Sequence, residues 1–267
     1  MNPSRVGAII LRQYYLLSGS PQRVLPLFAW VAVDILLWGF ITRYLNAVSH
    51  SGFNFVPALL GAILLWDFLT RVMQGVTTAF FEDVWSRNFL NFFATPLRVS
   101  EYVTGLVVIG VITSLLGLVV MIVLARAAFG LSFLSYGAVL APFLMVLFVT
   151  GIALGITGAA IVLRLGPASE WLVWPIPTLI SPFAGVFYPI SVLPGWMQVI
   201  AKVLPPAYVF DSMRAVVAGK PADLSRLAIG GGLSIAYLAL ACLFFASVYR
   251  YAIRTGLIAR YSAETVS

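Results

Sequence analysis

Six stretches of the chain are long and apolar enough to cross a lipid bilayer as helices. A spanning helix needs about 20 mostly apolar residues, because the hydrocarbon layer is about 30 Å thick. Only 9% of the residues are charged and 61% are hydrophobic, whereas about a quarter of a soluble domain is charged. The sequence therefore predicts an all-α integral membrane protein with six transmembrane helices. The stretches lie at residues 24–44, 55–80, 102–125, 136–163, 171–189 and 224–249.

The segment from residue 181 to residue 220 begins apolar but is interrupted by five prolines. Proline has no backbone N–H and breaks helices, and unsatisfied backbone groups cannot face lipid. We therefore expect this segment to be held in protein, to line a wet cavity or to lie at the membrane surface. Pro175, Pro177 and Pro182 are also expected to kink the fifth stretch.

The arginines and lysines favour a cytoplasmic position for both ends of the chain. With the N-terminus inside, the cytoplasmic segments carry nine of these residues and the external segments carry six. Because such residues are enriched in cytoplasmic loops, we predict that both termini lie inside. The net charge of +7 lies mostly near the ends of the spans, which suits membrane orientation better than nucleic-acid binding.

Residues 1–22 predict an amphipathic helix ahead of the six-span domain, which takes up residues 23–267. On a helical wheel Arg5 and Arg12 nearly coincide, while Ile10 and Tyr14 group about a quarter-turn or more away. This pattern favours a helix that lies in the inner membrane surface and ends at the break at residues 19–21. The alternative is a polar start to the first span.

The cytoplasmic segment 81–101 predicts a second short amphipathic helix, after the second span. Its aromatic residues recur at helical spacing, with polar residues on other sides of the helix. A helix in this position is well placed to dock another protein, and a connecting helix resting on lipid is the alternative. The candidate contact residues are Glu82, Asp83, Trp85, Arg87 and Phe89.

Charged residues inside the spans are costly and usually face protein or water. Asp34 falls near the middle of the first span, and no local partner is evident for it. Asp67 and Arg71 are four residues apart on the second span, so they can pair along one helix face. Such residues either fix helix packing or line a translocation route. Aromatic residues that either stack on a substrate in that route or anchor helices are Trp38, Trp66, Phe187 and Tyr188.

Small residues in the fourth span, at Gly151, Gly155 and Gly158, predict a packing face. Small side chains let two helix backbones approach closely within a membrane. We therefore expect another helix to pack against this face.

The residues needed for several kinds of chemistry are missing. No GxxxxGK[S/T] loop occurs, so we expect no nucleotide bound by this chain itself. The single cysteine, Cys242, excludes an internal disulfide, and the single histidine, His50, excludes a histidine-cluster metal site. We expect no cofactor in this chain and no enzymatic activity of its own.

Two short sequences before the last span form a recognisable pattern. They are GVFYPISVLPGW at residues 185–196 and LPPAYVFDSMR at residues 204–214. With the two amphipathic helices and six spans, they resemble the type-2 ABC exporter permeases, the membrane subunits of ATP-binding-cassette exporters. Pro206 and Ala207 stand where leucine and threonine are common in that family. The residues that carry the motif are Pro189, Leu193, Pro194, Trp196, Pro205, Asp211 and Arg214.

The resemblance implies a permease subunit that forms the translocation pathway of an ATP-driven exporter in the bacterial cytoplasmic (inner) membrane. It implies a homodimer of this chain, joined to two copies of an ATPase subunit that bind ATP and Mg²⁺ and contact the 81–101 helix. It also implies external re-entrant helices at residues 192–203 and 207–217, within the segment 190–220. The substrate is left open between amphipathic, lipid-linked and polysaccharide molecules.

Two other functions are alternatives, a proton-coupled secondary transporter and a non-enzymatic membrane scaffold. Asp34 and Asp67 supply acids for the first, but the six spans show no obvious inverted repeat. A scaffold function would not explain why the segment before the last span is interrupted by prolines. A membrane-embedded enzyme is disfavoured because the chain has only one histidine and one cysteine and lacks clustered carboxylates. Membrane lipid is the remaining expected partner, and nucleic acid is not expected.

Overall fold

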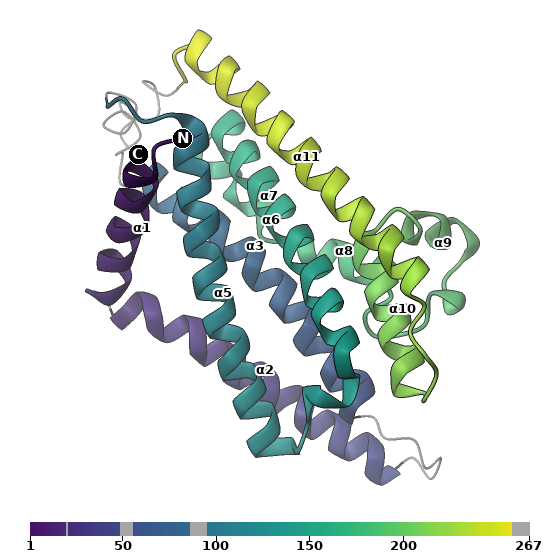
Figure 1. The fold of residues 1–267 in the computed structure, drawn as a ribbon. Helices are drawn as coiled ribbons and strands as arrows, with labels where there is room; N and C mark the ends of the chain where they lie inside the picture. Colours follow the sequence, from purple (N-terminus) through teal and green to yellow (C-terminus); the bar gives the residue numbers. More distant parts are fainter. Residues whose placement is uncertain (20, 49–55, 86–94, 258–267) are drawn as a thin grey trace.

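The computed structural model describes the chain apart from residues 20, 49–55, 86–94 and 258–267 (Figure 1). Its described part is built from helices and turns, with no strand, which confirms the all-α class. The N-terminal helix is α1 (Pro3–Ser18). Five long helices follow, α2 (Pro21–Val48), α3 (Gly61–Trp85), α5 (Val99–Phe129), α6 (Leu140–Leu165) and α11 (Leu224–Arg254). The short helices are α7 (Glu170–Val173), α8 (Ile176–Ala184), α9 (Gly195–Ala201) and α10 (Pro205–Val217), with helical turns η1 (Val56–Leu60), η2 (Phe133–Val139), η3 (Pro167–Ser169) and η4 (Ile190–Val192).

Five helical segments among the described residues are long and apolar enough to span a membrane. They correspond to the first four predicted spans and the last. The fifth predicted span, residues 171–189, is divided into α7 and α8, because Pro175 lies between them. With 9 residues, α8 is about 14 Å long, roughly half the hydrocarbon thickness. The count of six spans therefore stays a prediction. The five segments are Ala29–Val48, Val56–Trp85, Val99–Phe129, Tyr136–Leu165 and Leu224–Arg254.

α3 lies at the centre of the bundle, between α5 and α6, and α6 packs in turn against α11 (Figure 1). The apolar side chains of α3 are buried along its whole length, so this helix forms the middle of the core. α2 packs mainly against α5 and η1. The polar side of α3 therefore faces the region bounded by α1, α2 and α5.

Glycines of α6 allow its close approach to α3. A Cβ atom added at Gly151 would lie 2.7 Å from Cβ of Val72, and one added at Gly155 would lie 2.8 Å from Cβ of Val76. These distances are shorter than carbon atoms tolerate, so only glycine fits. The predicted small-residue packing face is confirmed.

Replacing Gly155 with alanine should destabilise the bundle by about 1–3 kcal/mol, because the added methyl group pushes α6 away from α3. Gly232→Ala in α11 is the matched control, since a Cβ there meets no atom within 4 Å. The thermal unfolding midpoint in detergent should fall for Gly155→Ala and stay near the wild-type value for Gly232→Ala. Equal midpoints for the two variants would contradict this packing.

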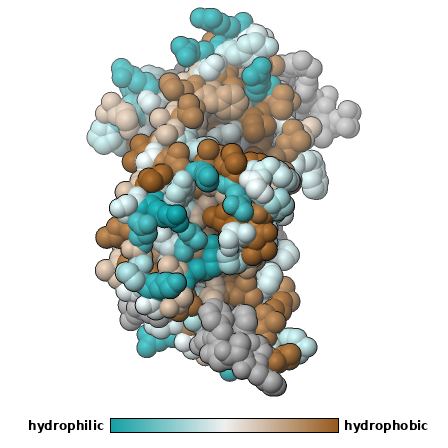
Figure 2. Space-filling model, turned by 90° about the vertical axis from the view of Figure 1, so that its right-hand side faces the viewer, coloured by the Kyte–Doolittle hydropathy of each residue, from teal (hydrophilic) through white to brown (hydrophobic). Residues whose placement is uncertain are grey.

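The side of the molecule that carries α9, α10 and α11 shows a banded surface (Figure 2). Hydrophilic residues gather at the top and across the middle, and mainly hydrophobic residues lie between them. Along α11, Ile229, Ile235 and Leu243 are more than half exposed. Exposed apolar side chains between two polar bands suit a helix whose middle faces lipid or another membrane subunit.

Candidate functional site

α1 is fixed to the bundle by ion pairs. Arg12 pairs with Asp83, whose side chain is completely buried near the end of α3. The hydroxyl group of Tyr102 in α5 donates a 2.7 Å hydrogen bond to the other oxygen of the same carboxylate. Asp83 therefore joins α1, α3 and α5 at one point.

A second contact lies at Glu101, in the first turn of α5. Its carboxylate accepts a 2.7 Å hydrogen bond from the backbone N–H of Asn2 and lies 3.4 Å from the guanidinium of Arg5. We call the Arg5–Glu101 and Arg12–Asp83 pairs together the N-terminal clasp. The clasp holds both ends of the basic side of α1 against the bundle.

The N-terminal clasp holds α1 against the protein, whereas the sequence predicts a helix that lies in the membrane surface. The helix itself is confirmed, and it ends at Ser18, just before the predicted break. Its arginines, however, face acids of the protein, whereas an isolated interfacial helix would turn them toward water. Leu11, Tyr14 and Tyr15 are more than half exposed. The placement of α1 at the membrane surface stays a prediction, and its docking onto α3 and α5 is a finding.

The predicted contact residues after the second span lie in different environments. α3 continues without a break to Trp85, so Glu82, Asp83 and Trp85 belong to its last turns. Trp85 is 51% exposed, but Asp83 has no exposed surface. In this conformation the carboxylate of Asp83 is covered by its own chain, and the predicted contact of this residue with an ATPase subunit stays a prediction. Arg87 and Phe89 lie outside the described residues.

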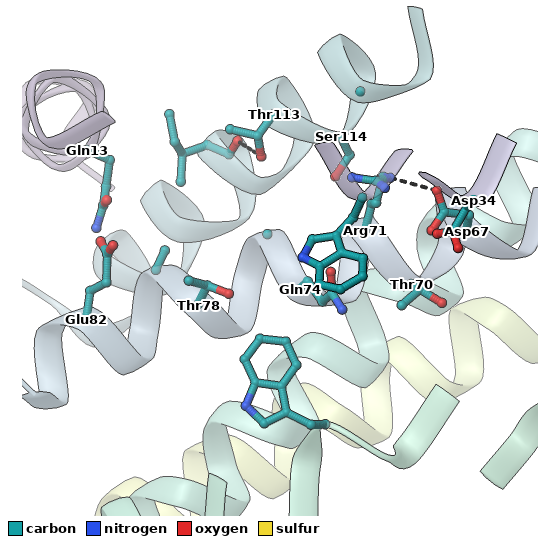
Figure 3. A pocket seen from close by; sticks show the side chains of 16 residues that line it. Gln13, Asp34, Asp67, Thr70, Arg71, Gln74, Thr78, Glu82, Thr113 and Ser114 are labelled. Atoms are coloured by element: carbon teal, nitrogen blue, oxygen red, sulfur yellow. Dashed lines mark hydrogen bonds and ion pairs between the residues drawn. The ribbon is translucent and has the colours of Figure 1, made fainter. Parts of the chain in front are cut away.

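A cavity of about 650 Å³ lies between α1, α2, α3 and α5 (Figure 3). α3 contributes a polar stripe whose residues recur three or four positions apart, the spacing of one helix face. From the first to the last of these residues the stripe is about 22 Å long. The cavity therefore follows most of the polar side of α3. The stripe consists of Asp67, Thr70, Arg71, Gln74, Thr78 and Glu82.

Three charged groups meet at one end of the cavity. The guanidinium Nε of Arg71 lies 2.8 Å from a carboxylate oxygen of Asp67, which confirms the predicted pair within one helix. Asp34 of α2 is half-buried beside this pair (Figure 3) and interacts electrostatically with both residues. All three line the cavity. Asp34 therefore lies beside Arg71 and also faces the cavity. This is the position expected of a residue that lines a translocation route.

Three hydroxyl groups on the cavity wall donate hydrogen bonds to the backbone. Thr70 donates to the carbonyl of Trp66 at 3.1 Å, and Ser114 donates to the carbonyl of Gly110 at 2.6 Å. Thr113 donates to a carbonyl of α5 in the same way. Because each hydroxyl has one proton and two lone pairs, these side chains offer acceptor atoms to anything in the cavity.

Several lining residues do not appear among the sequence-based candidates. Trp30, one turn before Asp34, and Trp174, between α7 and α8, contribute indole rings. The ring N–H of Trp174 donates to the carboxylate of Glu170 at 2.7 Å, which fixes the ring. Gln13 reaches the cavity from α1. The polar stripe on α3 has a readable spacing, but nothing in the sequence places Gln13 or Trp174 beside it.

The predicted aromatic route residues pack elsewhere. Trp38 stacks on Phe187 with ring centroids 5.8 Å apart, and the centroid of Trp66 lies 6.0 Å from that of Phe210. Tyr188 donates from its hydroxyl to a backbone carbonyl of α8 at 2.9 Å. Of the predicted route residues, only Asp34 and Asp67 line this cavity, and a route role for the aromatics stays a prediction.

Arginine side chains hold the proline-rich segment before α11. Arg214 of α10 donates to the carbonyl of Gly185, which ends α8 with a left-handed φ of 63°. Burial lowers the pKa of the Arg214 guanidinium, and the carboxylate of Asp211 opposes this shift. Asp211 lies 4.0 Å from Arg214 but 3.0 Å from Arg226 of α11. Asp211 therefore contacts Arg214 within the motif and lies closer to Arg226 of the last long helix.

The other motif residues mark the ends of the short helices. Pro194 precedes α9 and Pro205 begins α10. Leu193 is buried, whereas Pro189 and Trp196 are exposed. Two short helices therefore occupy the predicted segment 190–220, and their re-entrant position in a membrane stays a prediction.

Long apolar helices around a charged cavity define a multi-pass membrane protein with polar side chains gathered among its helices. The family model described as ABC-2 type transporter matches residues 8–218, which is most of the chain and includes the residues that line the cavity and nearly all of the proline-rich segment. The chain belongs to this family, whose membrane domains work with an ATP-binding partner subunit. A search of curated proteins found no matching relative.

Proposed function

We propose that this chain is the permease subunit of an ATP-driven exporter, and that two copies form the pathway for an amphipathic, lipid-linked or polysaccharide substrate. Two copies of a separate ATPase subunit would bind ATP and Mg²⁺. The observation that carries the proposal is the charged cavity along α3, in a chain whose family works with an ATP-binding subunit. A wall of carboxylates, amides and hydroxyls among membrane helices suits a route for a polar group.

The proposed setting is the bacterial cytoplasmic membrane, with both termini inside, six spans and re-entrant helices outside. α1, the end of α3, the start of α5 and the end of α11 lie at the same end of the bundle (Figure 1). This end carries Arg5 and Arg12, together with Arg250 and Arg254. Their gathering supports a cytoplasmic position for that end.

Movement of the ATPase subunits would reach the cavity through α3. This helix is continuous from Gly61 to Trp85, so a displacement at its exposed end carries Asp67 and Arg71 with it. Asp34 lies on α2, and the cavity therefore changes shape when α3 moves relative to α2. ATP drives such a change because it binds one state of the complex more tightly than the other.

Replacing Trp85 with alanine should reduce association with the ATPase subunit about thirtyfold, because a buried aromatic anchor contributes about 2 kcal/mol or more at an interface. The measurement is co-purification of the ATPase subunit with the tagged chain, followed by ATPase activity in vesicles. Trp196→Ala, an exposed tryptophan in the predicted external segment, should keep the association.

Two results would contradict this proposal. Unchanged association and ATPase activity in Trp85→Ala would remove this residue from the interface. Substrate transport in vesicles that hold a proton gradient but no ATPase subunit would instead favour a proton-coupled transporter.

A further inference from the structure

Resting on the proposed transport function, we propose that the cavity along α3 binds an organic cation with an apolar body. The cationic group would lie at the Asp34 end, and the apolar body would extend along α3 past Trp30 and Trp174. Three features of the wall support this assignment, its charge, its hydrogen-bonding pattern and its aromatic rings.

The charge of the wall is negative. Asp34, Asp67 and Glu82 contribute carboxyl groups, and Arg71 contributes the guanidinium. Arg71 already lies 2.8 Å from Asp67, so it is largely neutralised by its own helix neighbour. A carboxylate in a membrane interior is stabilised by a nearby cation. Arg71 is a single cation beside both Asp34 and Asp67. A ligand cation beside Asp34 would balance the remaining negative charge, whereas a phosphate or sulfonate would meet repulsion.

The hydrogen-bonding pattern also favours a donor ligand. Thr70, Thr113 and Ser114 donate hydrogen bonds to backbone carbonyls and present lone pairs to the cavity. An ammonium or amidinium group has only donors to offer. Acceptors on the wall and donors on the ligand are therefore complementary.

Gln13 gives an independent sign that the cavity takes a ligand. Its side chain is 2% exposed and lines the cavity, where it points toward Glu82 (Figure 3). Within the described part of the chain, its Nε2 atom has no hydrogen-bond partner. A buried amide without a partner is costly. Because this N–H lies at the end of the cavity away from Asp34, it would meet an acceptor atom carried by the body of the ligand, and the cationic group would lie at the other end.

The indole rings suit the apolar body of such a ligand. Trp30 and Trp174 line the same space, and the hydrogen bond to Glu170 fixes the second ring. Tryptophan faces attract cations and stack on flat apolar groups. The volume of about 650 Å³ lies within the range of drug-sized binding sites.

The test uses ethidium, a flat aromatic cation that carries two amino groups. The full-length chain is placed in nanodiscs of zwitterionic lipid without an ATPase subunit, and ethidium binding is followed by fluorescence against empty nanodiscs. Asp34→Asn should weaken binding about tenfold or more, because a charge interaction is lost from a low-dielectric site. Asp34→Glu should retain it, and Asp211→Asn, which lies outside the cavity, should match wild type.

Two competitors identify other ligand chemistry. The anion 1-anilinonaphthalene-8-sulfonate and the neutral sugar maltotriose should not displace ethidium. Trp30→Leu, which keeps an apolar side chain, should weaken ethidium binding about threefold or more. If Asp34→Asn does not fold, Trp30→Leu tests whether ethidium binds in this cavity. Displacement by either competitor, or unchanged affinity in Asp34→Asn, would overturn the proposal.

The outcome separates this proposal from the transport function. If the wild-type chain binds no ethidium but still associates with the ATPase subunit, only the proposed substrate class is refuted. Ethidium binding that depends on Asp34, in a chain that associates with no ATPase subunit, would refute only the proposed function.

Discussion

Replacing Asp83 with alanine should destabilise the chain by about 3 kcal/mol, because it leaves the guanidinium of Arg12 without its buried partner. The same change removes the acceptor of the Tyr102 hydroxyl group, so α1, α3 and α5 lose their common contact. The thermal unfolding midpoint in detergent should fall sharply. Protease cleavage near α1 should increase as the helix leaves the bundle.

A double-mutant cycle separates pairing from simple loss of charge. Arg12→Ala and Asp83→Ala together should cost clearly less than the sum of the single changes, since neither then leaves an unpaired partner. Arg226→Ala is the surface control, because Arg226 is 62% exposed in its contacts with Asp211 and Asp223. Such exposed pairs contribute about 0–1 kcal/mol. Additive effects at Arg12 and Asp83 would show that the clasp does not couple them.

Local patterns explain what could be predicted from the sequence. Apolar length predicted the long helices, and four-residue spacing predicted the Asp67–Arg71 pair, because both residues lie on one helix. The glycine face of α6 could also be predicted, because the spacing of the glycines along the helix is enough to define a packing surface. These features depend on neighbours within a few residues.

Contacts between distant elements could not be predicted in the same way. Arg12 and Asp83 are 71 positions apart in the sequence, and either residue alone is typical of a surface. The burial of Asp83 against α1 and α5 therefore cannot be predicted from the residues around it. Asp34 likewise had no evident partner, because its neighbours lie on α3. Residue type alone does not reveal whether an aromatic ring faces another ring or a cavity.

Removing the guanidinium of Arg71 should have a similarly large effect. Arg71→Met keeps most of the side-chain length but leaves Asp67 and Asp34 close together without their nearby cation. Two carboxylates without a counter-charge are unfavourable in a membrane, and breaking a buried pair costs about 3 kcal/mol or more. The yield of folded chain and its unfolding midpoint should both fall. Lys202→Met, at an exposed site outside the cavity, should leave them unchanged.

Exchanging the two residues distinguishes a packing role from a route role for this pair. The double variant Asp67→Arg, Arg71→Asp restores an ion pair at the same spacing, so its stability should return to within about 0.5 kcal/mol of wild type. The guanidinium, however, moves by about one helical turn, or 5.4 Å, and the charges facing Asp34 are rearranged. A pair that only fixes helix packing should recover both stability and ethidium binding. A pair that lines the route should recover stability while ethidium binding stays weak, and this second result is the one we expect.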